Sequence, residues 1–322
     1  MIFKNIDFHN VDHLEPNGDA YHMIRIPDEL RKVNDRVSLL GTGIELRFKM
    51  KSDKARIILR SANAYEAPVA EIVFGSLPAG WQHSSRVIHS HDTVITIEKP
   101  DMEKLYSVHR EHGLAFNPDV VRILLPYCVV DFVDVIGDVE PPSKADYPSK
   151  TGLFYGSSIT HGSLSIDPLH TYVYQLSDRL GTDYINLGYA GSAFVEKEMA
   201  EYIVSRKDWD FAFLELGINM ANNFEADVFE ERCKIFLDII SADKRPVLCT
   251  SIYTCLDETP EKLNAFREIV RKHCNGRIIF KDGLELMTTT KGLSADFVHP
   301  NVMGVYEITN NLTEFFKENL NF

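Results

Sequence analysis

Short stretches of alternating apolar and polar residues run through the first 140 positions of the chain. Residues 44–50, Ile-Glu-Leu-Arg-Phe-Lys-Met, show the period of two that is typical of a half-buried strand. One amphipathic helix is predicted over 102–112. Strands of the same kind, separated by turn-forming segments, are predicted over 55–60, 69–74, 93–98 and 120–125. This spacing predicts an all-β domain over residues 1–140, either a β-sandwich or a jelly roll.

Prolines mark the end of this pattern. Pro141, Pro142 and Pro148 lie close together, and proline fits neither the interior of a helix nor a central strand. We therefore predict an interdomain linker over 141–150 and a second domain over 151–322.

From residue 151 onward, predicted strands alternate with predicted helices. We treat the segment 211–216 as an apolar strand that is covered on both faces. Thr259 is a plausible helix N-cap because Pro260 follows it at the first helical position. The other predicted strands are 152–155, 183–187, 247–252 and 277–280, and the predicted helices are 170–180, 196–207, 226–240, 260–274 and 302–319. This alternation predicts a parallel, doubly wound α/β sheet.

Composition and charge exclude several classes of protein. The 322 residues are 44% hydrophobic and 25% charged, which is ordinary for a globular chain and excludes a disordered chain, a coiled coil and a collagen-like fibre. The formal net charge of -13 disfavours nucleic acid and anionic membrane surfaces as partners. No apolar run is long enough to cross a bilayer, and the N-terminal residues do not resemble a secretory signal. Five cysteines without a CxxC spacing favour a reduced, cytoplasmic protein over a disulfide scaffold or a zinc site.

Four short blocks of the second half lie where a predicted strand ends or a helix begins. They contain Ser158, Gly191, Asn219 and the pair Asp296 and His299. Each block alone is more often a turn or a helix cap. Because the carboxyl ends of parallel strands meet at one edge of a sheet, the four blocks together would supply a nucleophile, a backbone donor, a side-chain donor and a base with its orienting acid. That combination is what acyl transfer requires.

With these four blocks in this order, residues 150–305 resemble the SGNH (GDSL-like) esterase and acylhydrolase family, in the branch that carries an N-terminal β-sandwich. The resemblance implies a flavodoxin-like parallel sheet after the β domain. It implies Ser158 as nucleophile, Asp296 and His299 as its partners, and an oxyanion hole made by the Ser158 amide, Gly191 and Asn219.

Two positions depart from the family's motifs. The usual Gly-Asp-Ser opening is Gly-Ser-Ser at 156–158, and the usual Gly-x-Asn-Asp is Gly-Ile-Asn-Met at 217–220. The aspartate of the first motif is not the triad acid, so the expected chemistry does not depend on it. His161 and His170 lie close to Ser158 in sequence and remain alternatives for the base or for the pocket lining.

The resemblance implies a serine esterase that removes small acyl groups, often acetyl, from carbohydrates or other small alcohols. No cofactor or metal is expected, since His89 and His91 have no third ligand nearby in the sequence. Two alternatives stay open: an acyltransferase that uses the same residues, and a non-catalytic glycan-binding protein. The sequence does not determine the oligomeric state and is compatible with a homo-oligomer.

Overall fold

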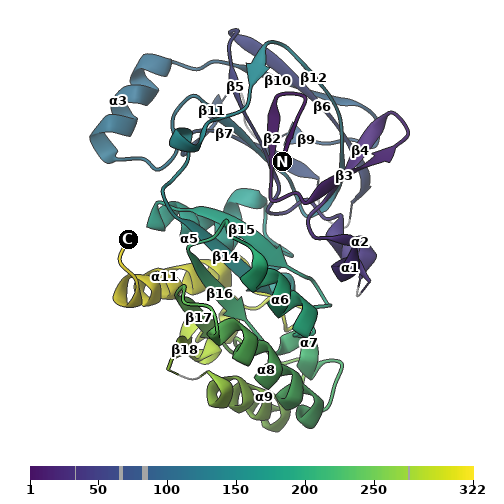
Figure 1. Cartoon of the computed structure of the whole chain (residues 1–322), viewed down its shortest axis with the longest axis vertical. Helices are drawn as coiled ribbons and strands as arrows, with labels where there is room; N and C mark the ends of the chain where they lie inside the picture. The colour runs from purple at the N-terminus through teal and green to yellow at the C-terminus, as the bar shows by residue number, and fades with distance from the viewer. Residues whose placement is uncertain (33, 65–67, 82–85, 275) are drawn as a thin grey trace. The chain divides into compact units, whose positions relative to one another are not determined.

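The computed structural model describes residues 1–32, 34–64, 68–81, 86–274 and 276–322. The chain divides into two compact units (Figure 1). The first contains Met1–Ser149 and Asp167–Leu169, and the second contains Lys150–Ile166 and His170–Phe322.

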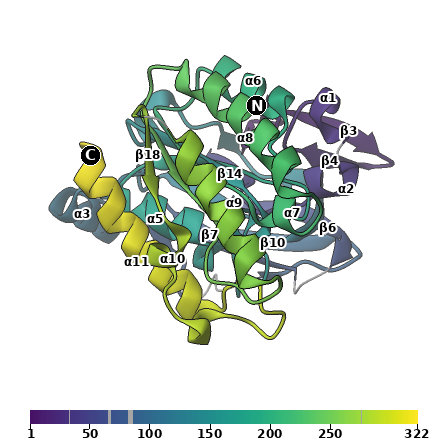
Figure 2. The same cartoon turned by 90° about the horizontal axis from the view of Figure 1, so that it is seen from below.

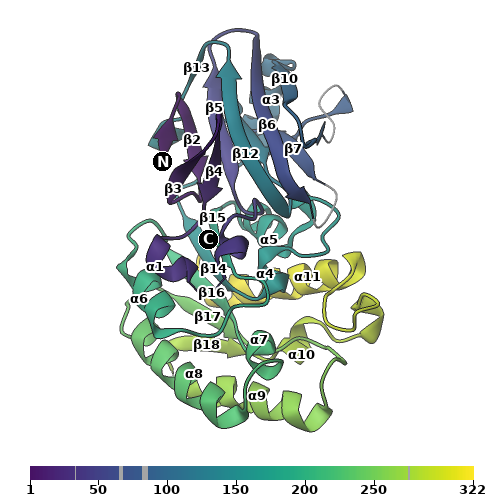
Figure 3. The same ribbon diagram turned by 90° about the vertical axis from the view of Figure 1, so that its right-hand side faces the viewer.

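The first unit is built from antiparallel strands in two sheets. One sheet has the order β1-β2-β5-β11-β7-β8, with β13 paired to β5 and β9 paired to β7, and the other has the order β10-β6-β12-β4-β3. Figure 3 shows the long strands β6 and β12 side by side. The strands are β1 Ile2–Phe3, β2 Ile6–His9, β3 His13–Asn17, β4 Ala20–Ile24, β5 Glu45–Met50, β6 Lys54–Ala64, β7 Val69–Phe74, β8 Leu77–Pro78, β9 Arg86–Val87, β10 Thr93–Glu98, β11 Val120–Leu124, β12 Cys128–Ile136 and β13 Val139–Glu140.

The core of this unit lies between the inward faces of its strands. Leu46 and Phe48 of β5 are fully buried, and they share one hydrophobic cluster with Ile57 of β6 and Phe132 of β12. Alternation along β5 therefore places its apolar residues in the core, as a period of two requires. The all-β architecture that the sequence predicts for this part of the chain is confirmed.

Two polar residues of β5 belong to a buried charged group. Glu45 and Arg47 are 0% and 1% exposed, and Arg122 of the paired strand β11 is 2% exposed. The Arg122 guanidinium donates to both oxygens of Glu45, at 2.6 and 2.7 Å, and Arg47 donates at 2.8 Å. Burial alone would raise the pKa of Glu45, but the charges of Arg122 and Arg47 outweigh it and hold that pKa well below its usual range.

Replacing Glu45 with glutamine is expected to lower the free energy of unfolding by about 3–5 kcal/mol, because one charge of a buried, hydrogen-bonded ionic group is then removed. Urea unfolding measures this change. The matched control is Glu98→Gln, which breaks an exposed pair with Lys54 at 2.6 Å and should cost less than about 1 kcal/mol. Equal effects in the two variants would contradict our interpretation of the buried group.

The second unit contains one parallel sheet, and helices lie between its successive strands along the chain. Its strand order is β15-β14-β16-β17-β18, and every pair is parallel. This is the flavodoxin-like order, so the predicted doubly wound α/β fold is confirmed. The strands are β14 Thr151–Gly156, β15 Asp183–Gly188, β16 Phe211–Glu215, β17 Val247–Thr250 and β18 Ile278–Lys281.

The helices of this unit fall into two packed groups. Helices α6, α8 and α9 pack against one another in sequence order, and α11 packs on α5 (Figure 2). The aromatic ring of Phe316 on α11 packs against the rings of Phe154 and Phe213 from the sheet, which also contact each other. All helices of the described chain are α1 Asp28–Arg31, α2 Asp35–Ser38, α3 Met102–His112, η2 Lys144–Asp146, α4 Ser158–His161, η3 Pro168–His170, α5 Tyr172–Leu180, α6 Lys197–Ser205, α7 Ile218–Ala221, α8 Ala226–Ser241, α9 Pro260–His273, α10 Gly283–Leu286, η4 Thr290–Gly292 and α11 Val302–Asn319.

Several helix ends follow from local capping. The Thr259 side chain accepts a hydrogen bond from the Lys262 amide, with Pro260 at the first position, as the sequence predicts. Helix α5 begins at Tyr172 instead of the predicted residue 170, because Thr171 caps it. In the part of the chain that the structure describes, none of the helices has the length and apolar character needed to span a bilayer.

Candidate active site

The first predicted block forms a tight turn between β14 and the short helix α4. Ser157 is the N-cap of this helix, and its hydroxyl accepts a hydrogen bond from the Ile159 amide at 3.1 Å. Ser158 is therefore the first residue of α4, where a backbone amide has no partner within its own helix. Its side chain starts at the carboxyl end of a central strand.

The side chains of Ser158, His299 and Asp296 form a hydrogen-bonded chain. Ser158 Oγ lies 2.7 Å from His299 Nε2, and His299 Nδ1 lies 2.6 Å from Asp296 Oδ2. A carboxylate can only accept, so Nδ1 carries the proton and Nε2 is left to accept from the serine hydroxyl. This arrangement can remove a proton from Ser158.

Asp296 is held as an acceptor by its own loop. Its second oxygen, Oδ1, accepts from the amides of Val298 and His299, both at 3.0 Å. Burial pushes the pKa of Asp296 upward, but these bonds and the His299 side chain outweigh that effect and hold the pKa below its ordinary value. The carboxylate is therefore available to stabilise a charged imidazole.

The loop that carries this pair adopts an unusual backbone conformation. Phe297, between Asp296 and His299, has a φ of +63°, in the left-handed region that is uncommon for an aromatic residue. Its carbonyl accepts from the Leu256 amide at 2.8 Å, and the His299 carbonyl accepts from the Ser294 amide at 2.8 Å. These bonds hold the backbone of the loop at Phe297, between the aspartate and the histidine, and at His299 itself.

The two other predicted donors follow the strands that flank β14. Gly191 has a φ of +67° in the loop after β15, and Asn219 lies in α7, directly after β16. The Ala193 amide donates to Asn219 Oδ1 at 3.1 Å and so joins the two loops. Because Oδ1 accepts this bond, the Nδ2 group is the end of the carboxamide left to donate elsewhere.

Close packing brings the first two blocks together. A Cβ atom on Gly188, the last residue of β15, would lie 2.2 Å from the backbone nitrogen of His161. Only glycine fits at that position, so the end of β15 contacts α4 directly. The registers of β14 with β15 and β16 place all three strand ends at the same edge of the sheet.

The structure also distinguishes among the three histidines that could serve as the base. The imidazole that is hydrogen-bonded to Ser158 Oγ belongs to His299. His161 is fully buried in α4, and His170 ends the 3-10 helix η3. The sequence analysis left these two histidines open as bases, and the geometry favours His299.

One buried acidic residue beside the site escaped the sequence analysis. Glu215, at the end of β16, is 1% exposed, and its carboxylate contacts the turn that carries Ser158. Treating 211–216 as a uniformly apolar strand passed over this residue and was wrong at that position. An acidic residue at the end of an otherwise apolar strand is the signal that could have identified it.

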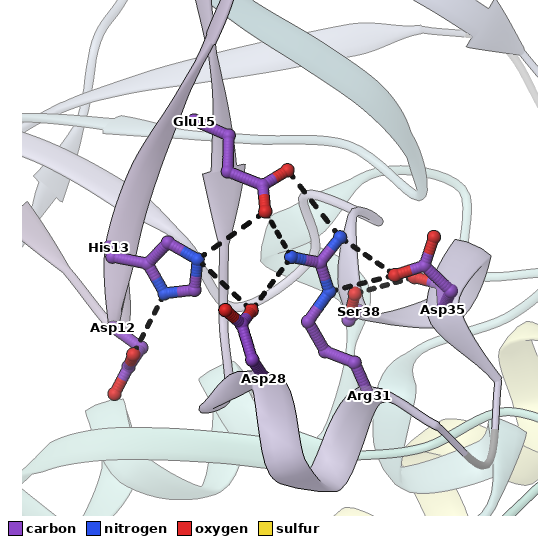
Figure 4. Close-up of polar contacts among 7 residues, drawn as sticks. All are labelled: Asp12, His13, Glu15, Asp28, Arg31, Asp35 and Ser38. Carbon is purple, nitrogen blue, oxygen red and sulfur yellow. Dashed lines mark hydrogen bonds and ion pairs between the residues drawn. The ribbon is translucent and has the colours of Figure 1, made fainter.

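Three groups of the metal-ligating type lie together in the first unit. His13, Glu15 and Asp28 offer ligand atoms that lie within 4.8 Å of one another. Figure 4 shows that the Arg31 side chain reaches the same carboxylates. Arg31 donates to Glu15 and, at 3.0 Å, to Asp28, and it also donates to Asp35 at 2.7 Å. Since arginine already provides the positive charge, we interpret this group as an ion-pair network that ties α1 to β3.

The second half of the chain matches a known family. The GDSL-like Lipase/Acylhydrolase family matches residues 149–317, which is more than half of the 322 residues. All of the predicted site residues lie inside this range. No curated protein sequence matches the chain.

Several solved structures share the fold of nearly the whole chain. A salicylyl-acyltransferase from a tetracycline biosynthetic pathway has a TM-score of 0.76 at 16% identity, over 98% of this chain and 94% of that chain. A putative GDSL-like lipase from Bacteroides ovatus has a TM-score of 0.70 at 16% identity, over 98% and 95%. A family two carbohydrate esterase from Cellvibrio japonicus has a TM-score of 0.63 at 10% identity, over 98% and 95%.

Proposed function

The chain belongs to the GDSL-like lipase/acylhydrolase family, and on this basis we propose that it is a serine esterase that removes small acyl groups, acetyl foremost, from carbohydrates or other small alcohols. The observation that carries the proposal is the hydrogen-bonded chain from Ser158 through His299 to Asp296. In such a chain the serine becomes a nucleophile when the histidine accepts its proton.

The proposed reaction has two steps. His299 takes the Ser158 proton as the oxygen attacks the ester carbonyl, and Asp296 stabilises the resulting imidazolium. The same histidine then returns the proton to the leaving alcohol. Water repeats the sequence on the acyl-enzyme, releases the carboxylic acid and restores the serine.

Charge that develops on the carbonyl oxygen needs donors in fixed positions. The Ser158 amide at the start of α4, the Gly191 amide and the Asn219 carboxamide are the proposed donors. The bond from Ala193 to Asn219 Oδ1 supports this assignment, because it fixes the carboxamide with its amino group available.

Support for a carbohydrate ester comes from the relatives. The Cellvibrio japonicus protein of similar fold is a carbohydrate esterase. The net charge of -13 also favours a neutral substrate over a phosphorylated one.

The test is ester hydrolysis by the purified full chain. We expect it to release p-nitrophenol from p-nitrophenyl acetate and to deacetylate members of a panel of acetylated sugars. A chelator such as EDTA is expected to leave both rates unchanged, because the proposed residues need no metal ion. Loss of the rate with EDTA, or binding of glycans without any turnover, would contradict the proposal.

An acyltransferase is the second candidate, because an alcohol can replace water in the second step and one relative of similar fold is a salicylyl-acyltransferase. Product analysis with a competing alcohol or sugar acceptor separates the two reactions. Hydrolysis is favoured if free acid dominates at millimolar acceptor, and transfer is favoured if the new ester dominates.

A further inference from the structure

The carboxylate of Glu215 lies against the turn that carries Ser158, although it comes from a different strand. We infer that Glu215 is a positioning residue that holds this turn, in a chain that has Ser157 where the family's Gly-Asp-Ser opening has an aspartate. The inference rests on the proposed function, in that Ser158 must be the nucleophile.

One oxygen of Glu215 accepts three hydrogen bonds from the turn. The Ser157 amide and the Ser157 hydroxyl each donate to Oε2 at 2.7 Å, and the Thr160 hydroxyl donates at 3.0 Å. These donors lie on both sides of Ser158 in sequence. The carboxylate therefore fixes the residues before and after the nucleophile to the neighbouring strand β16.

Thr160 extends this network to a buried tyrosine. Its hydroxyl lies 2.7 Å from the Tyr172 hydroxyl. Since the single Thr160 proton is donated to Glu215, the tyrosine is the donor in this pair. Tyr172 is 1% exposed and belongs to α5, so the turn is fixed from both β16 and α5.

The close approach of Glu215 depends on the glycine that precedes the turn. A Cβ atom on Gly156 would lie 2.6 Å from Glu215 Oε2 and 2.3 Å from Thr160 Oγ1. Any other residue at position 156 would displace the carboxylate or the threonine. Because Gly156 has no side chain, the end of β14 leaves room for the Glu215 carboxylate from β16.

The same geometry explains why position 157 holds serine. The Ser157 hydroxyl lies 2.7 Å from Glu215 Oε2, so an aspartate there would bring a second carboxylate into contact with the first. Two carboxylates that share such a site cannot both be ionised without a large cost. Serine instead provides a donor to Glu215 and still caps α4.

The charge of Glu215 is not essential to these bonds. Burial raises the pKa of Glu215 to about 7, while the bonds from Ser157 and Thr160 act in the opposite direction. Among the described residues no donor reaches Oε1, so a proton there leaves the three bonds to Oε2 in place. Glutamine can imitate this protonated form, with its oxygen at the position of Oε2.

Four variants of the full chain test the inference: Glu215→Ala, Glu215→Gln, Ser157→Asp and the double variant with Ser157→Asp and Glu215→Gln. Turnover and KM on p-nitrophenyl acetate are measured per active serine, titrated with a fluorophosphonate. We expect Glu215→Ala to lower kcat about 10²-fold at unchanged KM, as misplacement of a reacting group does. Glu215→Gln should retain most of kcat.

The aspartate variants give the readout that a merely structural role would not produce. Ser157→Asp should lower kcat strongly, and adding Glu215→Gln should restore it by about tenfold or more, because only one of the two groups in contact is then charged. The exposed Glu314 on α11 provides a matched control as Glu314→Ala, which should leave kcat and KM unchanged.

The inference is overturned if Glu215→Ala keeps more than half of kcat per active serine, or if the double variant is no better than Ser157→Asp alone. The second comparison stands even if Glu215→Ala fails to fold. Activity that survives in Ser158→Ala would instead remove the proposed function itself, so the two failures are distinguishable.

Discussion

Replacing Ser158 with alanine is expected to lower ester turnover about 10⁶-fold, since the proposed acyl-enzyme pathway depends on Ser158 as its nucleophile. The side chain is 8% exposed, and its hydroxyl is bonded to His299. Alanine fills the same space without the oxygen, so the melting temperature should stay close to that of the unchanged chain. Release of p-nitrophenol and labelling by a fluorophosphonate should both disappear.

Ser157→Ala is the neighbouring control. It removes the N-cap of α4 and one of the three bonds to Glu215, but it leaves the Ser157 amide bonded to the carboxylate. Loss of a serine cap costs about 1 kcal/mol of stability. Turnover should fall far less than in Ser158→Ala. Equal losses in the two variants would contradict the assignment of Ser158 as the nucleophile.

Strands and helices with a regular apolar period were predictable from the sequence. The predicted bounds of the helices 102–112 and 302–319 coincide with α3 and α11, and the strand 93–98 coincides with β10. Each has a regular pattern, and α3 also has local caps, with Asp101 accepting from the Lys104 amide and Gly113 in the left-handed region. The bounds of such elements can therefore be predicted from the local sequence.

Strand β12 was not predicted, and its irregular register explains why. The pairing with β6 shifts between Val129 and Val130 and again between Phe132 and Asp134. Each shift breaks the period of two. In addition, Asp131 is buried within the strand, where His22 and Asn17 of other strands bind it. Those partners are more than 100 residues away in sequence, so no local pattern reveals them.

The contacts of the candidate site likewise fall into those that the sequence predicts and those that depend on the fold. Asp296 and His299 are three residues apart, so their contact could be expected from spacing alone. The contact between Ser158 and His299 spans 141 residues, and it was predictable only because both fit motifs at the ends of elements. Glu215 belongs to no such motif, and its bonds to Ser157 depend on β14 and β16 being neighbours in the sheet. Strand order decides that contact.

Substitution of Asn219 provides the best test of whether a predicted site residue has a catalytic or a structural role. The sequence alone left a helix cap as the simpler interpretation, but the N-cap of α7 is Gly217, and Asn219 lies inside the helix. Its Oδ1 accepts instead from the Ala193 amide at 3.1 Å. Loss of that bond in Asn219→Ala should cost about 1 kcal/mol of stability.

The effect of Asn219→Ala on the reaction is expected to be much larger. If Nδ2 donates to the oxyanion, turnover should fall roughly 10²–10³-fold with little change in KM, because the bond matters mainly in the transition state. Met220, the next residue, has no side-chain donor that could replace it. Asn219→Asp should be at least as harmful, since its carboxylate can still accept from Ala193 but would repel the oxyanion.

Steady-state kinetics of the two Asn219 variants, with melting temperatures to establish that each is folded, provide the test. A folded Asn219→Ala enzyme that keeps more than about half of its turnover would mean that backbone amides alone form the oxyanion hole. Asn219 would then serve only to join the Ala193 loop to α7. If the fall in kcat, expressed as a free energy, far exceeds the loss in the free energy of unfolding, the Nδ2 group acts in the transition state. A purely structural bond would lower both by similar amounts.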